Sequence, residues 1–139
     1  MNETSGIAGL IYSRLSSDPT IQSVCGSRIY EGVSPENTQF PFIRMQEQGS
    51  HDVLGVGGVR ILVPSLWLVR AITRGESFTP IQSVADAIDT QLQGRYNVIN
   101  GSVYNLGGQR SSPFRLTEVD NGVQYRHLGG LYRLWAHKA

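Results

Sequence analysis

The segment that most limits the fold is the run Val59-Arg-Ile-Leu-Val-Pro-Ser-Leu-Trp-Leu-Val-Arg-Ala-Ile72, which is apolar at both odd and even positions over most of its length. Successive side chains of a strand point to opposite faces of a sheet, so a strand with this sequence needs protein on both faces. Arg60, Pro64 and Arg70 break the run well before the roughly 20 apolar residues that span a bilayer. The run therefore predicts a strand inside a folded protein, not a membrane segment, with Pro64 at an edge or bulged position.

The length of the chain limits how that strand can be covered. With 139 residues, the chain has the size of one domain with one hydrophobic core, and we expect a single domain over residues 1–139. One domain of this size has little protein to spare for covering both faces of such a strand. We therefore expect a neighbouring subunit to bury the surplus apolar surface.

Three segments combine apolar residues at helical spacing with residues that start helices. Thr4 and Ser5 precede the first segment, Asp18-Pro19 the second and Thr79-Pro80 the third. An Asp or Thr side chain can accept early backbone amides, and Pro has no amide to leave unpaired. Gly26 and Gly94 are expected to end the second and third helices. The apolar positions are Ile7, Leu10, Ile11 and Leu15; Ile21, Val24 and Cys25; and Ile81, Val84, Ala85, Ile88 and Leu92.

The remaining segments alternate with the period of two that is typical of strands. We predict strands over residues 28–31, 41–52, 59–72, 95–99, 102–106, 114–119 and 123–136. Glycine-containing reversals are expected at residues 53–58, Asn100-Gly101 and 120–122, and a bulge is expected at Gly129-Gly130. In segment 41–52, one face has Ile43, Met45 and Glu47, and the other has Phe42, Arg44 and Gln46.

The order of these elements indicates the fold class. Helices precede one group of strands, and a third helix precedes the second group. A parallel sheet would need regular crossover helices between its strands, and the sequence does not contain them. We therefore predict an α+β fold with a single mainly antiparallel β-sheet and helices packed on one face.

The charge balance argues against several functions. Twelve Lys and Arg residues against eleven Asp and Glu give a net charge of +1, which is too small to neutralise many phosphates. Cys25 is the single cysteine and cannot form an internal disulfide. The N-terminal residues lack the basic start and apolar core of a signal peptide, so we expect the chain to fold in a reducing cytoplasm.

No residue pattern indicates catalysis or a metal or cofactor site. Cys25 with His51, His127 or His137 has the residue types of a nucleophile and base, but a small apolar residue closing a helix explains Cys25 more simply. The spacing of the three His residues matches no zinc motif. Gly55–Gly58 lacks the Lys and Ser/Thr ending of a phosphate loop. We therefore expect no catalytic, cofactor-binding or metal-binding residues and no enzyme activity.

Four charged residues have a second interpretation that we consider weaker. Asp86 and Asp89 can share a cation, but the solvated face of an amphipathic helix explains them more simply. Arg70 and Arg74 can contact nucleic acid. In a near-neutral chain, however, ion pairs or subunit contacts are the expected role of isolated arginines.

Several motifs, in their order along the chain, resemble one family. They are Asp18-Pro19, Gly26-Ser-Arg-Ile-Tyr-Glu-Gly-Val33, Pro35, Phe40-Pro-Phe-Ile43, Leu66-Trp-Leu-Val-Arg-Ala71 and Ala85-Asp-Ala-Ile88. This order is similar to that of the tail-completion, or tail terminator, proteins of long-tailed bacteriophages and related gene transfer particles. The resemblance covers nearly the whole chain and departs from the family pattern mainly after Gly94.

The resemblance implies a structural virion protein at the head-proximal end of the tail. Such a protein forms a hexameric ring that caps the tail tube, ends its elongation and joins it to the neck of the head. The implied partners are other copies of the chain, the tail tube protein, a neck or head-completion protein and the tape-measure protein. DNA passes through the lumen without specific binding, which a near-neutral subunit suits.

Some residues are candidates for the subunit or tube interface. The run 59–72 is apolar on both faces, and residues 53–58 form a glycine-rich reversal, so we expect contacts from Val53, Leu54, Val56, Leu66, Leu68 and Arg70. Two alternatives remain. One is a neck or head-completion protein, a stopper or adaptor, and the other is a small binding module or enzyme outside the virion.

Overall fold

The computed structural model describes residues 3–94, 98–100 and 103–138. These residues form a seven-stranded sheet in the order β1-β2-β4-β7-β6-β5, with β3 paired to one end of β4. β1 is parallel to β2, and the remaining pairs are antiparallel. The elements are α1 (Glu3–Ser16), α2 (Pro19–Cys25), β1 (Ile29–Glu31), β2 (Phe42–Ser50), β3 (Val53–Leu54), the 3-10 turn η1 (Val56–Gly58), β4 (Arg60–Arg74), α3 (Thr79–Leu92), β5 (Val98–Asn100), β6 (Val103–Asp120) and β7 (Val123–Lys138).

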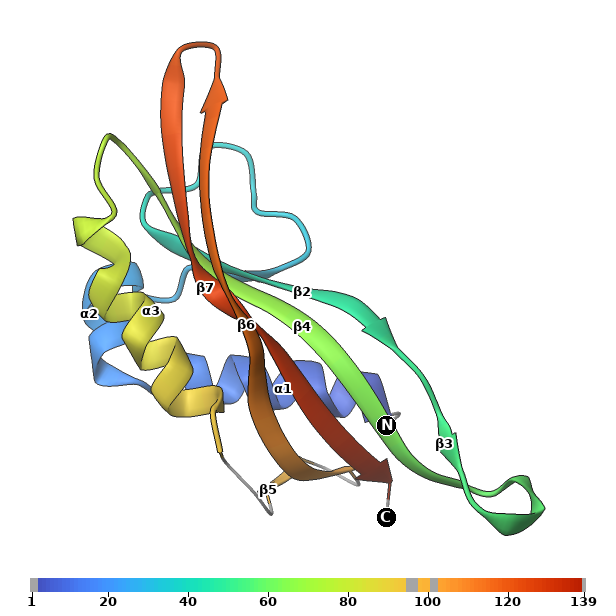
Figure 1. Cartoon of the computed structure of the whole chain (residues 1–139). Coiled ribbons are helices and arrows are strands. Elements are labelled where there is room, and N and C mark those ends of the chain that lie inside the picture. The colour runs from blue at the N-terminus through green and yellow to red at the C-terminus, as the bar shows by residue number, and fades with distance from the viewer. Residues whose placement is uncertain (1–2, 95–97, 101–102, 139) are drawn as a thin grey trace.

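The three helices lie on one face of this sheet (Figure 1). α1 and α3 contact β4 and β7, and α2 packs against α1 and α3. The apolar residues of the helices meet Trp67, Val69 and Ala71 of β4 in the hydrophobic core. We call this side of the sheet the helix face and the other side the open face. The predicted α+β fold, with helices on one face of a mainly antiparallel sheet, is confirmed.

Two of the three predicted helix starts are confirmed. Asp18 caps α2, because its Oδ1 accepts the amides of residues 20 and 21 at 2.9 and 3.1 Å. α3 begins at Thr79 as predicted, but its N-cap residue is Phe78, which makes no side-chain capping hydrogen bond. α1 begins at Glu3, however, so Thr4 and Ser5 lie inside its first turn and not before it. Glu3 is buried and pairs with Arg60 at 3.0 Å. An acidic side chain in the first turn is favoured by the helix dipole, which accounts for the earlier start.

Pro64 lies on a central strand, so its predicted edge position is wrong. On one side it pairs with Trp135 of β7. On the other side it faces the break between β2, which ends at Ser50, and β3, which begins at Val53. The Pro64 carbonyl accepts the amide of His51 at 3.3 Å. The proline nitrogen points toward the same break, so its missing hydrogen removes no ladder hydrogen bond.

The C-terminal half forms one long hairpin instead of the separate strands predicted at 102–106 and 114–119. Both segments belong to β6, whose pairing with β7 is irregular between Asn105 and Gly107 and between Arg110 and Ser112. At each irregularity the alternation of residues between the two faces changes register, so one twisted strand continues through both predicted segments. The turn after β6 is the predicted one, with positive φ at residues 121 and 122. β5 pairs with β6 as predicted, whereas Gly101 of their turn and residues 95–97 lie outside the described residues.

Gly129 and Gly130 do not form the predicted bulge. The pairing of β7 with β4 and β6 passes through both residues without a shift. A Cβ atom at Gly129 would lie 2.1 Å from the carbonyl oxygen of Val69 and 2.6 Å from Cα of Arg70. Glycine is required at this position because the backbones of β4 and β7 approach too closely for a side chain.

Candidate functional site

The β3–β4 hairpin projects from the body of the molecule and carries an apolar tip (Figure 1, lower right). We call residues 53–61 the apolar arm. Its exposed apolar side chains are Leu54, Val56, Val59 and Ile61, with exposed fractions of 58%, 102%, 63% and 49%. Arg60, also within the arm, is exposed and pairs with Glu3. Residues 53–59 contain no charged side chain. A contiguous apolar tip of this kind is typical of a surface that another molecule covers.

The six predicted interface residues fall into two separate groups. Val53, Leu54 and Val56 belong to the apolar arm. Leu66, Leu68 and Arg70 lie on the open face of β4, because they alternate with the core residues Trp67 and Val69. Leu68 is only 8% exposed, so the chain itself already covers it, whereas Leu66 and Arg70 are half-buried.

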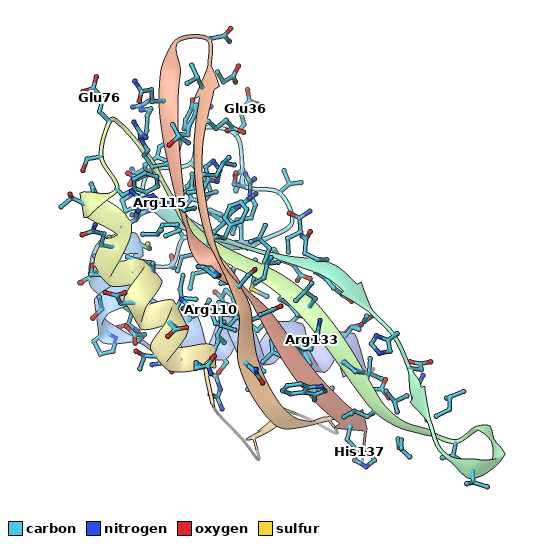
Figure 2. The ribbon with its side chains drawn as sticks, viewed as in Figure 1. Glu36, Glu76, Arg110, Arg115, Arg133 and His137 are labelled. Carbon is cyan, nitrogen blue, oxygen red and sulfur yellow. The ribbon has the colours of Figure 1, made fainter. Side chains whose placement is uncertain are left out.

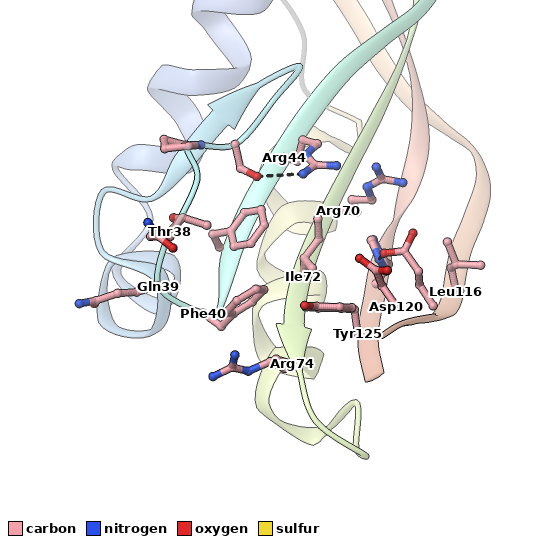
Figure 3. A pocket seen from close by; sticks show the side chains of 16 residues that line it. Thr38, Gln39, Phe40, Arg44, Arg70, Ile72, Arg74, Leu116, Asp120 and Tyr125 are labelled. Carbon is pink, nitrogen blue, oxygen red and sulfur yellow. Dashed lines mark hydrogen bonds and ion pairs between the residues drawn. The ribbon is translucent and has the colours of Figure 1, made fainter. Parts of the chain in front are cut away.

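A cleft of about 870 Å³ opens on the open face beside Arg70 (Figure 3). Loop 32–41 forms one wall, β2 and β4 form the floor, and the β6–β7 hairpin forms the other wall. We call it the arginine cleft. Its charged and titratable lining residues are Arg44, Arg70, Arg74, Glu118, Asp120 and His127.

Side-chain contacts hold loop 32–41 beside the sheet. Nη2 of Arg44 donates to Oγ of Ser34 at 2.9 Å, and the hydroxyls of Tyr30 and Thr38 are 2.9 Å apart. The ring of Phe40 packs against those of Phe42 and Tyr125, with centroids 5.3 and 5.8 Å apart. The wall of the cleft is therefore fixed by both hydrogen bonds and aromatic contacts.

Arg44 and Arg70 are direct cross-strand partners on β2 and β4. Two like charges thus project from adjacent strands to the same side, which is destabilising unless something compensates them. Nε of each arginine is buried and has no hydrogen-bond partner among the described residues. Arg70 lies over the ring of Phe114, at 5.5 Å from its centroid. Burial, and then the charge of Arg44, lower the pKa of Arg70, while Glu118 opposes the change.

His127 lies in the same cleft and is 4% exposed. Neither ring nitrogen has a hydrogen-bond partner within the described part of the chain. Oε1 of Glu118 is 3.7 Å from Nε2, too far for a hydrogen bond. Burial, followed by the charge of Arg70, lowers the pKa of His127, and Glu118 acts in the opposite direction. The cleft therefore buries polar atoms without giving them partners among the described residues, which is unfavourable for the stability of the fold.

The structure does not bring together the residues considered for nucleophilic catalysis. Cys25 is buried in the core on the helix face, whereas His127 lies on the open face. Burial raises the pKa of Cys25 to about 11, so its thiol stays protonated at neutral pH. Nδ1 of His137 is 3.0 Å from the carbonyl oxygen of Ile61. Among the residues described, no three His, Cys, Asp or Glu side chains form a group that could hold a metal ion.

The sequence suggested that Asp89 lies on a solvated helix face. Its side chain is partly exposed, at 39%, but it also contacts the sheet. Its Oδ1 accepts the hydroxyl of Tyr132 at 3.0 Å and lies 3.9 Å from Nη1 of Arg110, which is labelled in Figure 2. Asp86 is exposed. Asp89 therefore helps to attach α3 to the sheet, because Arg110 and Tyr132 come from β6 and β7.

Arg70, Arg74 and His127 were all considered from the sequence, but His127 was placed with Cys25 and not with the arginines. The alternation in residues 41–52 placed Phe42 and Arg44 on one face, and this prediction is confirmed. Glu118 and the position of His127 were missed, because they depend on the pairing of β4, β6 and β7. An isolated His or Glu in a strand carries no local signal of that pairing.

No helix among the described residues is long and apolar enough to cross a membrane.

Comparisons with known proteins agree with this geometry. No curated protein matches the sequence. A chain in a solved structure described as the virion of a native gene transfer agent particle matches with a TM-score of 0.76 over 96% of both chains. At 14% identity, this match shows a shared fold. The family model for tail completion protein gp17 matches residues 9–127, and the chain therefore belongs to the family of tail completion proteins.

Proposed function

We propose that this tail completion protein forms a ring on the last ring of the tail tube, stops tube growth and joins the tail to the head. Membership of the family supports a structural role in the virion. The observation that carries the ring proposal is the apolar arm, with three exposed apolar side chains and no charge between residues 53 and 59, and a fourth at Ile61 beyond Arg60. In a ring of identical subunits, one surface of each subunit fits a different surface of its neighbour, and an exposed apolar arm is suited to such a contact.

The arm is the part of the molecule best suited to contact a neighbouring subunit or the tube. It extends beyond the end of β2, so its tip is free of the core. Burying four such side chains in an interface contributes roughly 1–2 kcal/mol each. We therefore propose Val53, Leu54 and Val56 as contact residues.

The open face supplies the second part of the proposed interface. Leu66 and Arg70 are half-buried and available for contact. Leu68 is covered within the chain, so its role is to shape this surface rather than to touch a partner. The role is non-enzymatic, and the expected partners are tube, neck and tape-measure proteins, with DNA passing through the ring unbound.

Electron microscopy of particles from the producing strain tests the position in the virion. The subunit carries a C-terminal tag, and the position of the label on each particle is recorded. Label at the head-proximal end of the tail, with overlong or unjoined tails when the subunit is absent, supports the proposal. Label at the portal with normal tails would make the chain a neck protein, and unlabelled particles would contradict a virion role.

A pair of valine variants tests the arm. We expect Val56→Asp to reduce the fraction of joined particles of normal tail length by tenfold or more, because a carboxylate would be buried in the interface. Val119→Asp, at the tip of the opposite hairpin, is the control, since Val119 is 66% exposed. Thermal unfolding of both purified variants should match the unaltered chain. Normal particles with Val56→Asp would refute the contact role of the arm.

Leu66→Asp tests the open face in the same assay. Because Leu66 is half-buried, the variant needs a check that the fold is intact, by circular dichroism and thermal unfolding. A folded variant that still assembles normally, by size-exclusion chromatography and in particles, would remove β4 from the proposed interface.

A further inference from the structure

We propose that the arginine cleft binds a single carboxylate group on a segment of a partner polypeptide. The proposal rests on the proposed function in one respect only, namely that the partner polypeptide is another protein of the virion. Binding of the carboxylate itself is a property of the cleft and is measurable without assembly. The chemistry of the ligand is inferred from the charges and the unpaired polar atoms of the described residues that line the cleft.

Several polar atoms of the cleft have no partner among the described residues. They are Nε of Arg44, Nε of Arg70 and both ring nitrogens of His127, of which one carries the hydrogen in the neutral ring. Arginine pairs with carboxylates through planar, two-point hydrogen bonds that are stronger than those between neutral groups. A carboxylate in the cleft would pair with these guanidinium groups and compensate the two like charges that the pairing of β2 and β4 places opposite each other.

The charges of the cleft favour a single anionic group over a polyanion such as nucleic acid. Three arginines line it, but so do Glu118 and Asp120 on the β6 side. With His127 neutral, three positive and two negative charges leave a net charge of +1 in the cleft. One carboxylate balances this charge. A nucleic acid backbone carries many phosphates, which the two acidic residues would repel.

The walls of the cleft favour a polypeptide as the carrier of the carboxylate. The rings of Phe40, Phe42 and Tyr125 and the side chain of Ile72 line it beside the arginines (Figure 3). Aromatic residues and arginines are enriched where proteins bind one another. A volume of about 870 Å³ has room for more than one side chain, so the proposed ligand is an acidic residue next to an apolar one.

Nuclear magnetic resonance of the purified full chain tests this with two matched probes. N-acetyl-Glu-Leu-amide carries the carboxylate, and N-acetyl-Gln-Leu-amide has an uncharged amide of the same shape. We expect the Glu peptide to shift the Nε–Hε signals of Arg44 and Arg70 and the ring signals of His127. The Gln peptide should bind at least about tenfold more weakly, because it lacks the charge-assisted hydrogen bonds.

Three variants make the result specific. Arg70→Met should abolish binding of the Glu peptide. Arg133→Met is the matched control, because Arg133 lies farther along β7 (Figure 2) and does not line the cleft. Val56→Asp should also bind normally, so loss of assembly through the arm is distinguishable from loss of the carboxylate site.

Four outcomes would overturn the proposal. The first is that the Glu and Gln peptides bind equally well, and the second is that Arg70→Met binds the Glu peptide as the unaltered chain does. The third is that a 12-base-pair DNA duplex shifts the same signals more strongly than the peptide. The fourth is that the chain sediments as a monomer and the Glu peptide shifts none of these signals. If the chain self-associates, a second copy is the carrier. Arg70→Met must then dissociate it while Arg133→Met does not, and a failure of this difference would equally refute the proposal.

Discussion

The two faces of β4 differ in how far the chain completes them by itself. On the helix face, Trp67, Val69 and Ala71 are at most 1% exposed under α1 and α3. On the open face, Leu66 and Arg70 are half-buried, and Nε of Arg70 lacks a hydrogen-bond partner in the described structure. Alternate residues of one strand therefore differ. One set lies in the core, whereas the other includes Leu66 and Arg70, which are half-buried and which we propose as contact residues.

A pair of tryptophan variants should give the largest effect, and it tests whether the helix face contributes more to stability than the open face. Trp67 lies on the helix face and donates from Nε1 to Oγ of Ser65 at 3.2 Å. We expect Trp67→Ala to lower the free energy of unfolding by about 3–5 kcal/mol, because it leaves a cavity in the core. Denaturation in urea, followed by circular dichroism, measures the change.

Trp135→Ala is the control on the open face. Trp135 pairs with Pro64 across β4 and β7 and is half-buried. Its loss should cost only about 1–2 kcal/mol, because less apolar surface leaves the protein interior. Equal losses for the two variants would show that both faces contribute equally to stability.

Gly129 tests whether the open face also depends on close backbone contact. We expect Gly129→Ala to lower the free energy of unfolding by about 2–3 kcal/mol, because its Cβ would meet the backbone of Val69 and Arg70. Gly49→Ala on β2 is the matched control. No heavy atom lies within 4 Å of its added Cβ, so the change should stay within about 0.5 kcal/mol. A neutral Gly129→Ala would show that β4 and β7 separate easily.

The cap of α2 is a second test of the helix face, with a smaller expected effect on stability. Asp18 accepts two backbone amides and also Nε2 of Gln91 from α3, at 2.9 Å. We expect Asp18→Ala to cost about 1–2 kcal/mol in urea denaturation. Asp86→Ala, on the exposed side of α3, should be close to neutral. If Asp18→Ala were equally neutral, the cap and the link between the helices would be dispensable.

The helix face was largely predictable from the sequence, because its signals are local. Apolar spacing and the Asp18-Pro19 and Thr79-Pro80 starts define the helices within a few residues. β2 could also be oriented, since alternation placed Arg44 and Phe42 on one face.

The open face was predictable only in part, because it depends on pairing between distant segments. The cleft needs His127 of β7 beside Arg70 of β4, and two irregularities in β6 shift its phase relative to β7. Gly129 was interpreted as a bulge because a glycine in a strand gives the same local signal for a bulge and for a close backbone approach. Only the register of the sheet distinguishes these two causes.

The smallest expected effect concerns pH and tests the open face alone. In the unfolded chain His127 binds a proton near its ordinary pKa of about 6.5, whereas burial and the charges of Arg70 and Arg44 lower its pKa in the folded chain. Between these two pKa values the unfolded state binds more protons. The free energy of unfolding should therefore fall as the pH drops below 6.5, and level off below the folded pKa.

Urea denaturation at a series of pH values, compared between variants, isolates this contribution. His127→Gln should remove the fall, and His51→Gln, at an exposed position, should keep it. Glu118→Gln should extend the fall to lower pH, because Glu118 is the group that raises the pKa of His127. A carboxylate ligand would raise the pKa of His127 as Glu118 does, and so narrow the pH range over which the free energy of unfolding falls. If His127→Gln leaves the fall unchanged, other titrating groups set the acid stability and the buried imidazole has no part in it.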